Sequence, residues 1–148
     1  MKKILLSIFT TIICVNSYSQ NANDSTAIIR LLEKESSTWR SGDVKAHADC
    51  WAIKPYSRIL VSTGDGTALD IDPNMVLNPP AGMMGNGGVA VNSNYKMNIS
   101  GSNAWVSHNE ESTAADGKKT YSYEMRILEK INGEWKLVGQ SIHIYKPK

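Results

Sequence analysis

The stretch WRSGDVKAHADCW (residues 39–51) places two large aromatic residues around a Gly-Asp pair. Glycine readily adopts the left-handed conformation that ends a helix, so Gly42 is a natural stop. Asp43 is a favoured N-cap residue, so a new helix is expected to begin directly after it. Trp39 and Trp51 are then expected on the apolar faces of two consecutive helices, with the Gly-Asp pair as the corner between them.

Upstream of this corner, apolar residues recur at the spacing of an amphipathic helix. The pattern predicts a first helix over residues 24–41, with Asp24 or Ser25 as its N-cap, and a second helix from Asp43 to about residue 52. Cys50 lies on the second helix. It is expected to be a small buried residue, and the alternative is a nucleophilic thiol.

The first twenty residues are typical of a secretory signal peptide. Two lysines precede the apolar run ILLSIFTTIICV, which is too short to span a bilayer, and small residues precede a cleavage point after Ser19 or Gln20. We therefore expect residues 1–20 to be removed. Residues 21–148 are expected to form one exported domain, periplasmic or secreted, with no membrane attachment after cleavage.

Charge and cysteine content limit the partners of this domain. The formal charge of the chain is +2, and the two N-terminal lysines leave with the signal peptide, so the mature domain is neutral. The longest basic cluster is the pair Lys118-Lys119, which is too small for binding to a phosphate backbone, so no nucleic acid partner is expected. Only Cys50 remains after cleavage, which excludes an internal disulfide.

Beyond Pro55 the apolar pattern changes from helical spacing to alternation. The segments SRILVST and TALDID predict a hairpin around a Gly-Asp-Gly turn, and one helical turn is expected near residues 74–77. Four longer extended runs follow, joined by short turns that contain glycine: residues 89–100, 103–113, 118–131 and 134–145. Helices followed by antiparallel strands predict an α+β fold, in which the N-terminal helices pack into a strongly curved antiparallel sheet.

The order of these features resembles the nuclear transport factor 2-like superfamily, which has a cystatin-like fold and includes SnoaL-like polyketide cyclases and ketosteroid isomerases. The motifs that carry the resemblance are Trp39-x-x-Gly42-Asp43-x-x-Ala46, Gly64-Asp65-Gly66, SGSNAWV (100–106) and RILEKINGEWKLV (126–138). Together they cover nearly the whole mature chain. The resemblance implies a cone-shaped α+β barrel with a pocket at its open end, and a homodimer through the outer face of the sheet. Because such folds host many chemistries, function has to be argued from the site.

The resemblance also bears on catalysis. Ketosteroid isomerases use an Asp base, a helix Tyr and a protonated Asp, and the matching positions here fall near Ser62, on Glu35 and near Met125. An isomerase of that kind is therefore not expected. Glu35 lies four residues from both Leu31 and Trp39 on the apolar stripe, where desolvation raises a carboxyl pKa and suits a general acid or base. The alternative is that Glu35 lies at the stripe's edge, in solvent or paired with an arginine.

Aromatic residues on the strands suggest a ligand pocket. Tyr121, Tyr123 and Met125 alternate along one strand and share a face, which suits a pocket or a core. The predicted pocket residues are Trp39, Trp51, Trp105, Tyr121, Tyr123 and Met125. Glu124 and Arg126 lie on the opposite face of the strand, and we expect them to form a solvated or dimer-face pair.

Motifs for metals and cofactors are weak. His108 and Glu110 share one strand face and, with His143, form a candidate two-His-one-carboxylate site, but polar residues on the wet face of a strand are the preferred interpretation. No calcium loop, phosphate loop or Ser-His-Asp arrangement occurs, so neither metal nor cofactor is expected. The loop at residues 78–88 is unexplained. Its two adjacent methionines suit the mouth of a pocket, and a variable surface loop is the alternative.

Three functions remain open. The first is an exported protein that binds a small apolar or carbohydrate-like molecule without assignable catalysis. The second is an exported isomerase, cyclase or hydrolase that uses Glu35 as general acid or base on such a ligand. The third is a dimeric interaction module with a filled cavity, which requires Trp105, Tyr121 and Tyr123 to be buried against the helices. An open cavity favours the first two, and the second also requires Glu35 to line it.

Overall fold

The structure is a computed structural model that describes residues 23–147, so the predicted signal peptide at residues 1–20 lies outside the described residues. A long helix covers residues 23–41, and the short helix α2 follows at Val44–Ala48. The strands are β1 (Ile59–Ser62), β2 (Ala68–Ile71), β3 (Gly88–Ser100), β4 (Asn103–Ala114), β5 (Lys119–Ile131) and β6 (Glu134–Tyr145). A 3-10 helical turn at Pro73–Val76 follows β2. No helix in this part of the chain has the length and apolarity to cross a bilayer.

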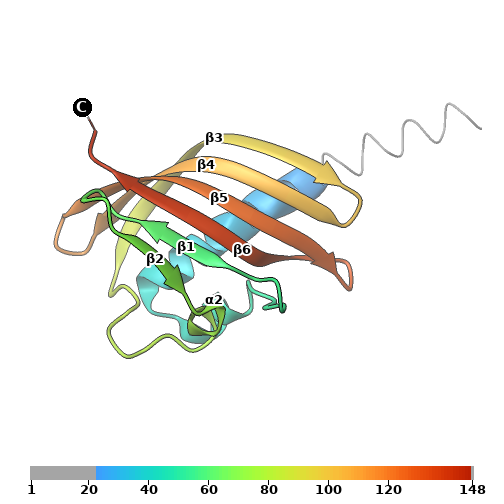
Figure 1. Cartoon of the computed structure of the whole chain (residues 1–148), viewed down its shortest axis with the longest axis horizontal. Coiled ribbons are helices and arrows are strands. Elements are labelled where there is room, and N and C mark those ends of the chain that lie inside the picture. The colour runs from blue at the N-terminus through green and yellow to red at the C-terminus, as the bar shows by residue number, and fades with distance from the viewer. Residues whose placement is uncertain (1–22, 148) are drawn as a thin grey trace, which may run out of the picture.

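The six strands form one curved sheet that wraps over the long helix (Figure 1). Their order is β2-β1-β6-β5-β4-β3, with β1 parallel to β6 and the remaining pairs antiparallel. This order leaves β2 and β3 as the edges, so the sheet stays open. Register shifts interrupt β3 between Ser93 and Lys96 and β5 between Ile127 and Leu128, and such bulges sharpen the bend of a sheet. The predicted α+β fold with helices packed into a curved sheet is confirmed.

The corner between the two helices forms as the sequence predicted. Gly42 has a φ of 73°, the left-handed conformation that favours glycine. The side chain of Asp43 caps α2 by accepting a hydrogen bond from the backbone N–H of Ala46 at 3.0 Å. The helix ends at Ala48, earlier than predicted, because the chain turns there so that Trp51 can form an isolated parallel bridge with the sheet.

The sequence suggested Asp24 as an N-cap of the long helix. Asp24 does not have this role, because the helix already includes residue 23. Its buried carboxylate accepts hydrogen bonds from Lys130 Nζ at 2.6 Å and Trp135 Nε1 at 3.0 Å. Burial alone would raise the pKa of Asp24, but the hydrogen bonds from Lys130 and Trp135 outweigh it and hold the pKa below its ordinary value. The carboxylate therefore fastens the helix to the sheet.

The apolar core lies between the long helix and the inner face of the sheet. Ile28 and Leu32 of the helix are fully buried in the same cluster as Leu128 and Leu137 of the sheet. Cys50 belongs to this cluster, and burial raises the pKa of its thiol to about 11. The structure therefore supports Cys50 as a small buried core residue and not as a nucleophilic thiol.

Candidate functional site

A cavity of about 430 Å³ lies between the long helix and the inner face of the sheet. One wall is apolar and comes from β1, β2, β6, the 3-10 turn, the following loop and the end of the long helix: Ile59, Val61, Ile71, Met75, Val76, Met83, Ile142, Ile144 and Trp39. The other wall is polar and comes mainly from the long helix, β4 and β5: Glu35, Ser36, Arg40, Glu110, Ser112, Thr120, Ser122, Glu124 and Arg126. Most ligand sites combine a largely apolar lining with a few polar groups in this way.

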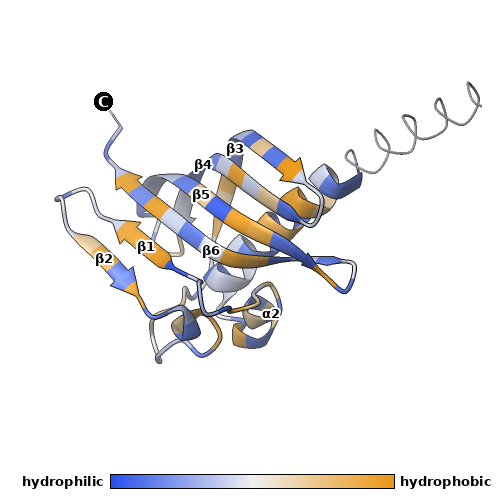
Figure 2. Cartoon of the chain, turned by 45° about the vertical axis from the view of Figure 1, so that its right-hand side comes forward, coloured by the Kyte–Doolittle hydropathy of each residue, from blue (hydrophilic) through white to orange (hydrophobic). Residues whose placement is uncertain are grey.

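Residues of β5 enter the polar wall because alternate side chains of a strand point to opposite faces. Ser122, Glu124 and Arg126 point inward and are buried, whereas Tyr123 and Met125 point outward. Figure 2 shows hydrophobic and hydrophilic positions alternating along the long strands. At this end of β5 it is the hydrophilic set that faces the helix.

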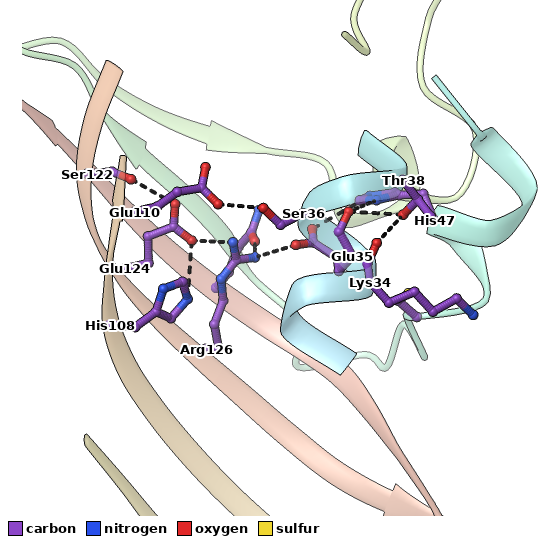
Figure 3. Close-up of polar contacts among 12 residues, drawn as sticks. Lys34, Glu35, Ser36, Thr38, His47, His108, Glu110, Ser122, Glu124 and Arg126 are labelled. Atoms are coloured by element: carbon purple, nitrogen blue, oxygen red, sulfur yellow. Dashed lines mark hydrogen bonds and ion pairs between the residues drawn. The ribbon is translucent and has the colours of Figure 1, made fainter. Parts of the chain in front are cut away.

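Arg126 is the centre of a buried charge cluster with Glu35, Glu124 and His108. Its guanidinium donates hydrogen bonds to Glu124 Oε2 and to Gln140 Oε1. Its Nη1 also lies 3.5 Å from Glu35 Oε2 on the long helix. Only 4% of Arg126 is exposed, and its surrounding carboxylates raise its pKa despite the burial that opposes them. Figure 3 shows these sheet side chains pointing toward the helical turn that carries Glu35.

Glu124 is the ionised carboxylate of this cluster. Burial raises its pKa, but Arg126 and the hydrogen bond that the Ser122 hydroxyl donates at 2.8 Å outweigh burial and hold the pKa below its ordinary value. His108 Nε2 lies 3.6 Å from Glu124 Oε2. Burial, with the charge of Arg126, lowers the pKa of His108, so this imidazole is neutral.

Glu35 has a different environment although it shares Arg126. Burial is the largest influence on its carboxyl and raises the pKa, and the charges of Glu124 and Glu110 act in the same direction. Arg126 opposes this shift without cancelling it, because it is already engaged by Glu124. Glu35 therefore has the protonation behaviour expected of a general acid or base, and it lines the cavity.

His47 on α2 lies behind Glu35. Its Nδ1 is 3.2 Å from the backbone carbonyl of Glu35, which can only accept, so Nδ1 carries the proton and Nε2 carries the lone pair. That Nε2 lies 3.8 Å from Glu35 Oε1 and has no hydrogen-bond partner among residues 23–147. Burial lowers the pKa of His47. A neutral imidazole thus offers its lone pair toward a carboxyl group with a raised pKa.

A second, partly buried ion pair joins the long helix to β4. Arg40 Nη1 lies 3.2 Å from Glu110 Oε1, and the Ser36 hydroxyl donates to Glu110 Oε2 at 2.6 Å. Arg40 also donates to Ser112 Oγ at 3.3 Å. These contacts occupy both carboxylate oxygens of Glu110.

The loop at residues 78–88 is fastened to the end of the long helix. The backbone N–H groups of Gly85 and Gly87 donate to the carbonyls of Trp39 and Arg40 at 3.0 and 2.7 Å. A Cβ atom on Gly85 would lie 2.8 Å from the Arg40 carbonyl, so the close approach requires glycine. The loop thereby brings Met83 into the lining of the cavity, which agrees with the predicted pocket mouth.

Only part of the predicted pocket set lines the cavity. Trp39 does, as does the predicted acid–base residue Glu35. Trp51 is buried behind His47, with ring centroids 6.3 Å apart, and lies outside the lining. The prediction was wrong for Trp105, Tyr121, Tyr123 and Met125, which point away from the cavity. The physical reason is that the polar set of β5, not the aromatic set, faces the helix, and that Trp105 of β4 alternates with the buried residues Ala104 and Val106.

Several residues that the sequence interpretation dismissed lie on the inner face of the sheet, and three of them, Glu110, Glu124 and Arg126, belong to the polar wall. Glu124 and Arg126 were expected in solvent or at a dimer face, and both are buried on the inner face. His108 and Glu110 were assigned to a wet face and also point inward, whereas His143 is exposed and lies beside Ser141 on the outer face. Among residues 23–147 no group of His, Cys, Asp and Glu side chains is arranged to hold a metal ion. The alternation of Ser122, Glu124 and Arg126 places them on one face of β5, but it does not say which face is inside.

Comparison with known proteins gives a likeness of fold. No protein-family model matches the sequence, and no curated protein matches it. A nuclear transport factor 2-like protein with a cystatin-like fold from Novosphingobium aromaticivorans superimposes with a TM-score of 0.67 at 12% identity, over 90% of each chain. A cystatin-like protein of unknown function from Nostoc punctiforme gives 0.65 at 16% identity, over 86% of this chain and 94% of that one.

A third similar structure carries a functional description. It is a protein from Novosphingobium aromaticivorans described as a candidate scytalone dehydratase, with a TM-score of 0.64 at 14% identity, over 87% of this chain and 89% of that one. Identities this low establish the architecture and not the activity. The chain therefore has the nuclear transport factor 2-like, cystatin-like α+β fold.

Proposed function

We propose that this protein binds a small, mostly apolar molecule with one polar group in the cavity under the sheet. The observation that carries this proposal is the division of the cavity into an apolar wall and a polar wall. A volume of about 430 Å³ suits a small organic molecule. The extent of the apolar wall favours an apolar ligand over a carbohydrate-like one.

Binding can be tested by thermal shift and native mass spectrometry on the purified domain, with a library of apolar compounds and oligosaccharides. A specific ligand should raise the melting temperature in proportion to the logarithm of its concentration. Val61→Phe should abolish the shift by filling the cavity, whereas Leu60→Phe, on the outer face of the same strand, should preserve it. A ligand that binds both variants equally would occupy another site and contradict the proposal.

A second candidate function is acid–base catalysis by Glu35, as in an isomerase, cyclase or hydrolase. It is favoured by the raised pKa of Glu35 at the cavity wall and by the lone pair of His47 Nε2 behind it. The description of one similar structure as a candidate scytalone dehydratase is compatible with such chemistry. On a substrate found by the library, Glu35→Gln should abolish turnover while the variant still folds and binds the substrate. Undiminished turnover would assign the chemistry to another residue or to none.

The outer face of the sheet supports a homodimer. Trp105, Tyr123, Met125 and Ile127 are each about half exposed there, and Trp105 lies opposite Ile127 in the register of β4 and β5. Exposed apolar patches of this kind mark interaction surfaces. The third function, a module with a filled cavity, is less well supported, because Trp105 and Tyr123 are exposed and a cavity is present.

Export to the periplasm or the medium is part of the proposal and rests on the N-terminal sequence alone. Mass spectrometry of the protein from the producing cells should find an N-terminus after Ser19 or Gln20 outside the cytoplasm. A full-length chain retained in the cytoplasm would contradict export and leave the binding proposal intact.

A further inference from the structure

The charged side chains that line the cavity are unequal in number. Among the described residues they are three carboxylates, Glu35, Glu110 and Glu124, and two guanidinium groups, Arg40 and Arg126. The imidazoles next to them, His47 and His108, are neutral because burial lowers their pKa values. One carboxylate therefore lacks a cationic counterpart.

Both guanidinium groups are already committed to carboxylates. Arg126 binds Glu124, and Arg40 binds Glu110. A ligand with a carboxylate or phosphate would have to displace one of these partners, and an unpaired buried carboxylate is strongly destabilising. The cavity is therefore poorly suited to an anionic ligand.

Glu35 is the carboxyl that shares its cation and receives no close hydrogen bond from it. Its oxygens lie 3.5 Å from Arg126 Nη1 and 3.8 Å from His47 Nε2, both longer than a hydrogen bond. Glu110, in contrast, receives hydrogen bonds on both oxygens, and Glu124 receives them from Ser122 and Arg126. A donor in the cavity has its strongest unused acceptor at Glu35.

Resting on the proposed binding function, we infer that the cavity takes an apolar molecule with a single cationic amine, and that the ammonium group binds Glu35. The ammonium would balance the excess carboxylate, and the hydrocarbon part would lie against the apolar wall formed by residues such as Val61, Ile71 and Ile142. Charge-assisted hydrogen bonds in a water-poor site are stronger than neutral ones. The same site should therefore prefer an amine to an alcohol of equal size, and an alcohol to a carboxylate.

Amine binding should depend on pH through Glu35. The groups that face it are Arg40 on its own helix, His47 on α2, Glu110 and His108 on β4, and Glu124 and Arg126 on β5. Because the pKa of Glu35 is raised, a fraction of the free protein holds its proton, and an ammonium ligand expels it. Amine affinity should rise with pH across the titration of Glu35, and binding at the lower end of that range should release a proton to the buffer.

Three probes with one skeleton test the inference: 1-adamantanemethylamine, 1-adamantanemethanol and 1-adamantanecarboxylate. Isothermal titration calorimetry of the wild-type domain should give an affinity for the amine about tenfold or more above that for the alcohol. Heats in buffers of different ionisation enthalpy should show proton release with the amine only. The Glu35→Gln variant should bind the amine and the alcohol with about equal affinity. Glu33→Gln makes the same charge change at an exposed position of the same helix, and it should leave the preference for the amine unchanged.

The outcomes separate the two proposals. If the alcohol or the carboxylate binds as tightly as the amine, or if no proton is released, the inference about the amine is wrong and the binding function stands. If none of the three probes binds, the inference is likewise wrong, and the library screen on the same domain decides whether the binding function fails as well. The wild-type measurements decide the inference even if Glu35→Gln fails to fold.

Discussion

Along part of β5 the polar face of the strand is buried and the apolar face is exposed, the reverse of most sheets. On the inner face Ser122, Glu124 and Arg126 are buried beneath the helix, whereas on the outer face Tyr123 and Met125 are about half exposed. In an ordinary α+β protein the apolar face packs against the helix. The inversion is the reason for proposing a site at this end of the sheet, since buried charges oppose folding unless they are paired, and clusters of perturbed titratable groups occur often at functional sites.

The same strand returns to the usual arrangement further along. Leu128 is fully buried in the core with Ile28 and Leu32. The inner face of β5 therefore changes from polar to apolar between Arg126 and Leu128, next to the register shift at Ile127/Leu128. One strand thus serves the cavity at one end and the hydrophobic core at the other.

The largest expected effect comes from breaking the buried charge cluster. Arg126→Met leaves Glu124 buried without its partner, so the free energy of unfolding in urea should fall by about 3–5 kcal/mol. Arg58→Met is the matched control, because Arg58 forms an exposed ion pair with Asp70, and it should cost at most about 1 kcal/mol. Equal losses in the two variants would show that the inner cluster is not isolated from water.

An intermediate effect is expected from Glu35, and it depends on pH. Because the folded-state pKa of Glu35 is raised, its contribution to stability is fully present below its ordinary pKa of 4.5 and is lost as pH rises through the folded-state pKa. Glu35→Gln should therefore match the wild type near pH 4 and exceed its melting temperature at pH 8. A difference that does not change with pH would show that Glu35 is not the desolvated acid.

The smallest effect on the stability of one subunit is expected on the outer face. Met125→Lys should change the unfolding free energy of the monomer by no more than about 0.5 kcal/mol, because this side chain is half exposed. Sedimentation equilibrium should nevertheless show a shift from dimer to monomer. If the wild type is already monomeric at all concentrations, the outer face is not a dimer interface.

Most of the local structure was predictable because it depends on neighbouring residues. The four long strands begin and end within two residues of the predicted runs. The Asn132-Gly133 turn between β5 and β6 has positive φ at both residues, as a tight hairpin turn requires. The site was less predictable: Glu35 and Trp39 were expected at the cavity that they line, but Glu124 and Arg126 were assigned to solvent or to a dimer face.

The sequence by itself determined the helical corner at Gly42-Asp43, the alternation along the strands and the α+β class, because each follows from local backbone preference and side-chain period. The tertiary structure alone decided which face of β5 is inside. Alternation divides the side chains of a strand into two faces but does not show which face is buried. Assigning the apolar face to the interior is correct only where a hydrophobic core, and not a polar cavity, lies beneath the strand. Here the long helix brings Glu35 and Arg40 over the sheet, and those charges select the polar face.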